Sequence, residues 1–229
     1  MQYINNTVFN IDQCKGHYES FFIRANHPSK TLAFWIRYTI FSSKKNPKNT
    51  FAELWVIIFN GTTNNHHSLK AEFQFKNCIF SNNTLNVKVG ESILNEKKAK
   101  GEISDKNISI SWDLNIECSQ KPLLFLPEKF YKISFPKAKS LVPKPLAKFS
   151  GFLKINDIKI NVDFWIGSQN HNWGSKHTDK YAWGQISGFD NNKDSFLEIA
   201  TAQIKLGLIY SPKINRSEEH TSELQSHLN

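Results

Sequence analysis

The stretch Ile108–Ile116 reads ISISWDLNI, and it decides the fold class of this chain. Its apolar residues stand at every second position, so its isoleucines, Trp112 and Leu114 share one face of a β-strand. Polar residues occupy the other face. This pattern is typical of an antiparallel sheet with one face against the core and the other in water.

Similar alternation, or an apolar run of strand length, recurs along most of the chain. Further strands are predicted at residues 17–25, 32–41, 51–61, 71–80, 84–89, 181–190 and 195–204, with a hairpin around Asn156-Asp157 in 151–165. Clusters of Asn and Gly separate them. No segment shows a long helical period, so we predict an all-β protein built as an antiparallel barrel or sandwich.

A stretch rich in proline and lysine divides the chain. Residues 134–148 contain three prolines, which cannot donate to a sheet ladder, and we interpret them as an interdomain linker. Residues 1–133 are then an N-terminal β domain, and residues 149–215 are the first strands of a second one. Within that second part, residues 167–180 are predicted to form a loop.

The last 14 positions, residues 216–229, read RSEEHTSELQSHLN and differ from what precedes them. They are acidic, lack strand alternation, and resemble the translation of a short-read sequencing adapter. We therefore interpret them as an artefactual tail and exclude them from fold reasoning. On this interpretation the natural chain continues past Asn215, and the second domain is truncated here.

Composition argues against several classes of protein. The formal charge of +9 comes almost entirely from scattered lysines, without a nucleic-acid-binding motif, so we expect no nucleic-acid partner. No apolar run is long enough to span a membrane, although contact with a membrane surface stays open. The N-terminus lacks the pattern of a signal peptide. Cys14, Cys78 and Cys118 are odd in number and widely spaced, which favours reduced thiols and a cytoplasmic location.

Four stretches, in this order, resemble a known superfamily: GHYESFFIRAN (16–26), AFWIRYTIF (33–41), AELWVIIF (52–59) and NHNWGSKHTDKYAWGQ (170–185). They are similar to the two-domain lipocalin-like proteins grouped with carotenoid 1,2-hydratase (hydroxyneurosporene synthase) and, more distantly, tocopherol cyclase. The resemblance covers most of residues 16–210. It implies an antiparallel lipocalin-like β-barrel followed by a second lipocalin-like β domain, with an apolar ligand in a pocket.

The hydratases and cyclases resembled here protonate an isolated carbon–carbon double bond. That chemistry needs an acid kept protonated in a dry pocket and aromatic walls that tolerate a carbocation. His171 and Trp173 match the His-x-Trp part of the hydratase pattern, which makes them the candidate catalytic residues. The Tyr-x-Asp part has no match downstream. Either the proton donor lies beyond this sequence, or this chain does not carry out that reaction.

Two further groups are candidate ligand-binding residues. Tyr181, Trp183 and Gln185 alternate onto one face of a predicted strand, where they either line a pocket or pack between domains. Charged residues also interrupt the apolar strands of the first domain, and these we expect to form a buried polar cluster: Glu19, Arg37 and either Glu53 or Arg24. Such a cluster is a polar anchor for a ligand or a structural ion pair.

No cofactor or metal is expected. The sequence has no P-loop and no GxGxxG motif, and the spacing of His171, His177 and Asp179 matches no zinc motif. Three hypotheses for function remain: a protein that binds a lipophilic small molecule, for example of the isoprenoid type; a hydratase or cyclase acting on one; and a structural protein whose barrels are filled by side chains. The oligomeric state stays open.

Overall fold

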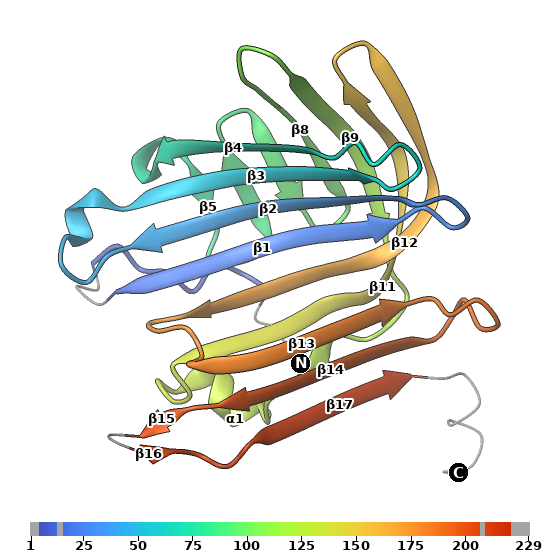
Figure 1. Cartoon of the computed structure of the whole chain (residues 1–229). Helices are drawn as coiled ribbons and strands as arrows, with labels where there is room; N and C mark the ends of the chain where they lie inside the picture. Colours follow the sequence, from blue (N-terminus) through green and yellow to red (C-terminus); the bar gives the residue numbers. More distant parts are fainter. Residues whose placement is uncertain (1–4, 13–15, 207–208, 221–229) are drawn as a thin grey trace.

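The structure is a computed structural model that describes residues 5–12, 16–206 and 209–220. It is almost entirely antiparallel β, and its main sheet curls into a half-barrel with a lipocalin-like fold (Figure 1). This confirms the predicted fold class. Among the described residues, no helix is both long enough and apolar enough to cross a bilayer.

The main sheet has 12 strands in the order β4-β3-β2-β1-β12-β11-β9-β8-β7-β6-β5, with β10 paired to β11. Their bounds are β1 His17–Asn26, β2 Leu32–Ser42, β3 Phe51–Asn60, β4 His67–Gln74, β5 Ile79–Phe80, β6 Asn86–Val89, β7 Ser92–Asn95, β8 Lys98–Ser104, β9 Ser109–Glu117, β10 Leu123–Leu124, β11 Ala138–Ile155 and β12 Ile158–Gly174. A short helix, α1 (Glu128–Lys132), precedes β11, and 3-10 turns lie at Pro47–Asn49 and Phe75–Asn77.

A second sheet packs against the main one. It has three strands in the order β13-β14-β17, with bounds β13 Lys180–Ser187, β14 Phe196–Gln203 and β17 Ile214–His220. Figure 1 shows these strands beside β11 and β12, with the small pair β15 (Lys205–Leu206) and β16 (Ile209–Tyr210) at one end. Phe196 of the second sheet packs on Val142 and Leu146 of β11.

The core of the half-barrel follows from the alternation. Every second residue of β1, β2, β3 and β9 is buried on the inner face, and Ile110, Trp112, Leu114 and Ile116 of the opening stretch belong to it. We call the opposite face, which β13, β14 and β17 cover in part, the outer face of the main sheet. Because side chains fill the inner face, we expect a ligand site on the outer face.

The predicted linker at 134–148 is wrong for residues 138–148, which form the first part of β11. The register of β11 against β12 shifts between Leu141 and Lys144 and again between Lys144 and Ala147. Pro143 and Pro145 stand in these two interruptions, so the absent N–H groups cost no regular ladder bond. Proline is compatible with a strand at such bulges.

The predicted loop at 167–180 is also wrong for its first half, because β12 continues to Gly174 and pairs with β1 as well as β11. Its polar side chains resemble a loop composition, yet most are buried. The hairpin around Asn156-Asp157 connects β11 to β12 as predicted. Residues 149–174 therefore belong to the main sheet, and the second sheet begins at Lys180.

The structure describes part of the C-terminal segment and two of the three cysteines. Residues 216–220 form the end of β17 and pair with β14. The rest of the predicted tail, residues 221–229, lies outside the described residues. Cys78 and Cys118 are free thiols, and Cys14 lies outside the described residues.

Position 151 in β11 requires a glycine, and this requirement can be tested. It has a φ of +136° at a register shift of β11, and a Cβ there would overlap the carbonyl oxygen of Asp113. We expect Gly151→Ala to lower the free energy of unfolding by about 2–4 kcal/mol, measured by urea denaturation. Gly184→Ala is the matched control, because its Cβ would meet only the Ile199 side chain, at 3.2 Å. Equal effects of the two substitutions would contradict this account.

Candidate functional site

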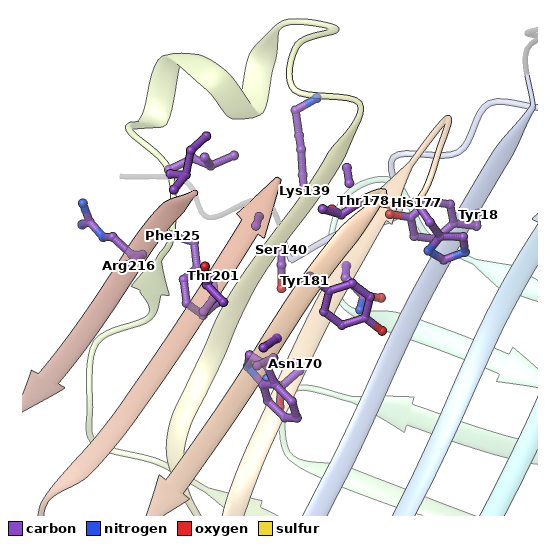
Figure 2. A pocket seen from close by; sticks show the side chains of 18 of the residues that line it. Tyr18, Phe125, Lys139, Ser140, Asn170, His177, Thr178, Tyr181, Thr201 and Arg216 are labelled. Carbon is purple, nitrogen blue, oxygen red and sulfur yellow. The ribbon is translucent and has the colours of Figure 1, made fainter. Parts of the chain in front are cut away.

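An open cleft lies between the two sheets and has a volume of about 420 Å³. The outer face of the main sheet contributes Tyr18, Phe22, Trp35, Arg37, Asn170 and Asn172, and the second sheet contributes Tyr181, Trp183, Ala200 and Arg216. Figure 2 shows Tyr18 and His177 side by side at one end of this cleft, Tyr181 farther in, and Arg216 and Phe125 at the opposite end.

Tyr181, Trp183 and Gln185 do share a face of β13, and that face is turned to the main sheet. Tyr181 and Trp183 line the cleft and keep 72% and 46% of their surface exposed. Gln185 lies farther along the strand, where its side-chain oxygen accepts hydrogen bonds from Arg24 Nε and Ser168 Oγ. Gln185 therefore connects the two sheets next to the cleft.

His171 and Trp173 lie on the other face of β12. The neighbours Asn170 and Asn172 line the cleft, so strict alternation turns His171 and Trp173 away from it, and both are buried. The His171 ring stacks on Phe21 and Trp173, with centroid distances of 4.1 and 4.4 Å. The two candidate catalytic residues consequently have no access to this cleft.

Glu19 is the partner that explains the buried histidine. Its carboxylate is fully buried, 2.9 Å from His171 Nε2 and 2.9 Å from His17 Nε2, and it accepts the backbone N–H groups of Val8 and Phe9, both at 2.8 Å. Burial by itself raises the pKa of Glu19, but the hydrogen bonds from the two histidines outweigh it and hold the pKa at about 2. Glu19 is thus an ionised structural group.

The predicted cluster of Glu19 with Arg37 and either Glu53 or Arg24 is wrong, and Arg24 instead binds Gln185 of the second sheet. Alternation places Glu19 on the inner face, whereas Arg37 and Glu53 lie on the outer face. Arg37 lines the cleft, and its Nε donates to Ser20 Oγ at 2.8 Å. Glu53 pairs with Lys70 Nζ at 2.6 Å. The apolar strands correctly indicated buried charges, but only the register shows which charges can meet.

Glu198 is the acidic residue that sequence reasoning missed. It lies on the face of β14 that is turned to the main sheet, fully buried, where its Oε1 accepts a 2.6 Å hydrogen bond from Trp183 Nε1. Burial raises its pKa to about 7, although Trp183 and the nearby charge of Arg24 oppose that shift. The signal was present in SFLEIATAQI, where a single carboxylate shares the alternating face of Phe196 and Ala200.

His177 and Asp179 follow β12 in the connection to β13. His177 stacks on Tyr18 with a centroid distance of 3.8 Å at the edge of the cleft. Asp179 accepts the backbone N–H of Lys205 at 3.0 Å. Within the part of the chain that the structure describes, no three His, Cys, Asp or Glu side chains are grouped as metal ligands would be.

Comparisons with known proteins support the fold more than the function. No protein-family model matches the chain. Two uncharacterised proteins from strains of Mycobacterium tuberculosis, MT0513 and Rv0493c, are each 28% identical over 106 residues, a stretch that covers 46% of this chain and 31% of theirs. This chain therefore matches less than a third of the length of those relatives.

Three solved structures share the fold. The provisionally named AttH protein NE1406 of Nitrosomonas europaea has a TM-score of 0.60 at 12% identity, over 90% of this chain and 68% of its own. Kievitone hydratase of Nectria haematococca has a TM-score of 0.57 at 13% identity, over 89% and 61%. CghA has a TM-score of 0.53 at 10% identity, over 90% and 58%. At such identities the likeness establishes the lipocalin-like architecture alone.

The pKa of Glu198 predicts a pH dependence of stability. Because the folded-state pKa of about 7 exceeds the ordinary value of 4.5, this carboxyl favours the folded state fully below pH 4.5 and loses that contribution as the pH rises through 7. We expect the unfolding free energy to fall by about 2–3 kcal/mol across this window, and Glu198→Gln to flatten the fall. Urea denaturation between pH 4 and 8 measures it. Glu91→Gln, at a side chain 87% exposed, is the control that should retain the wild-type slope.

Proposed function

We propose that this protein binds a lipophilic small molecule in the cleft between its two sheets. The observation that carries the proposal is the composition of that cleft: aromatic side chains from both sheets face a space of about 420 Å³ and remain partly exposed. Water-exposed aromatic surface in a concave site is typical of a ligand pocket. The inner face of the half-barrel, in contrast, is filled by its own core.

Filling the cleft tests this function. Ala200 lines the cleft. Ile199, which precedes it in β14, has its side chain on the opposite face and is 46% exposed. We expect Ala200→Trp to weaken the binding of Nile red, a neutral fluorescent lipophile, by at least about tenfold, because the indole occupies the ligand volume. Ile199→Trp should leave the affinity unchanged. Equal affinities of the two variants, both folded by circular dichroism, would count against the cleft as the site.

A second candidate function is protonation of an isolated carbon–carbon double bond, as in a hydratase or cyclase. Glu198 favours it, because a carboxyl with a pKa of about 7 holds its proton near neutral pH and lies against the indole of Trp183. The Glu198 proton would pass to one alkene carbon, and water would add to the resulting cation and return a proton to the carboxylate. Kievitone hydratase, which shares the fold, is named for a hydration.

Isotope incorporation tests the second function. With farnesol as an alkene probe in D2O, we expect the wild type to form a hydrated product with one carbon-bound deuterium, detected by mass spectrometry. The rate should fall as the pH rises through about 7, since only the protonated carboxyl is active. Glu198→Gln should abolish the product, while Glu102→Gln on β8 should not. Product formation that survives Glu198→Gln would exclude Glu198 as the acid.

A further inference from the structure

The charged side chains that line the cleft have one sign. They are Arg37 and Lys139, with Arg216 from the segment that we interpret as an artefactual tail, and among the described residues no carboxylate belongs to the lining. Glu198, the nearest buried acid in the second sheet, lies behind Trp183 and has a pKa of about 7. A cleft of this kind has a positive potential, which favours an anionic group in its occupant.

Arg37 is the cation best placed to receive such a group. Its Nε is committed to Ser20, and its guanidinium lies 5.8 Å from the Trp35 ring centroid. Glu53, the carboxylate that acts on it electrostatically, already binds Lys70 and accepts a 2.9 Å hydrogen bond from Trp55 Nε1. Across the described part of the chain, Arg37 has no carboxylate within ion-pair distance. The donors of its terminal nitrogens are therefore open to a ligand.

Two phenols and an imidazole surround this end of the cleft. Tyr18 and Tyr181 both interact electrostatically with Arg37, and His177 stacks on Tyr18. Burial raises the pKa of Tyr18 to about 12, so its phenol keeps its proton. Burial, with the charge of Arg37 adding to it, lowers the pKa of His177 and favours its neutral form. One fixed positive charge and neighbouring O–H donors make a receptor for a single negative charge.

We propose that the occupant of the cleft is an amphiphile with a carboxylate head group, and that Arg37 binds this carboxylate while the apolar part lies along Trp183. This inference rests on the proposed function. A planar carboxylate accepts two parallel hydrogen bonds from one guanidinium. A phosphate monoester carries about 1.5 to 2 negative charges at neutral pH, more than the single charge of the Arg37 guanidinium.

The geometry of β13 sets the direction of the ligand. Tyr181, Trp183 and Gln185 follow one another on the same face, and Gln185 pairs with Glu198 across the strands. Four residues of extended strand span about 13 Å, so a chain anchored at Arg37 beside Tyr181 passes Trp183 and ends near Glu198. A head group at Arg37 thus places the apolar end of the ligand along Trp183, whose indole N–H is hydrogen-bonded to Glu198.

A head-group comparison tests the proposal. Dodecanoate and dodecanol have the same tail, and each is titrated at pH 8 against Nile red bound to the full chain. We expect dodecanoate to bind at least about tenfold more tightly, the effect of a charge-assisted hydrogen-bonded pair. Arg37→Met should remove this preference by weakening dodecanoate alone. Arg37→Lys should retain part of it, because an ammonium keeps the charge without the bidentate geometry.

Controls separate this inference from the function on which it rests. Lys159→Met removes a cation on the distant β11–β12 hairpin, where Lys159 lies over Phe152, and should leave both affinities unchanged. If Arg37→Met does not fold, Tyr18→Phe, which removes only a phenolic oxygen, should lower the preference about threefold. Equal binding of acid and alcohol by the wild type overturns the head-group inference and leaves the binding function intact. Binding of neither probe overturns the binding function itself.

Discussion

The buried carboxylate of Glu19 holds three parts of the chain together, and the cleft depends on it. It binds His171 of β12, His17 of its own strand, and two backbone N–H groups of the N-terminal segment. An ionised group inside a protein is tolerated only with such partners. By fixing His171 on the inner face, this contact sets the alternation of β12, and Asn170 and Asn172 must then face the second sheet.

Two buried glutamates show how environment decides the role of a side chain. Glu19 and Glu198 are both fully buried, yet the pKa of Glu19 is about 2 and that of Glu198 about 7. Four donors stabilise the charge of Glu19. Glu198 has one strong donor, Trp183, and burial outweighs it. The first carboxylate is therefore structural, and the second retains its proton near neutral pH.

The two proposals for the cleft describe one arrangement of polar groups. Arg37 provides a positive charge in the cleft, the aromatic side chain of Trp183 lines it, and Glu198 holds its carboxyl behind the Trp183 indole. A site with a charged group beside apolar surface orients an amphiphile in one direction. The shared fold of kievitone hydratase and CghA is compatible with either function, since a fold hosts many functions.

The sequence by itself determined the all-β class, most strand positions and the β11–β12 hairpin, because period-2 alternation and turn residues are local properties. It also indicated that charges interrupt apolar strands and that Tyr181, Trp183 and Gln185 share a face. Only the tertiary structure decided that His171 and Trp173 point away from the cleft, that Pro143 and Pro145 fit a bulged strand, and that Glu198 is the acid beside the cleft. Alternation states which residues share a face, but the pairing of strands far apart in the chain decides what each face meets.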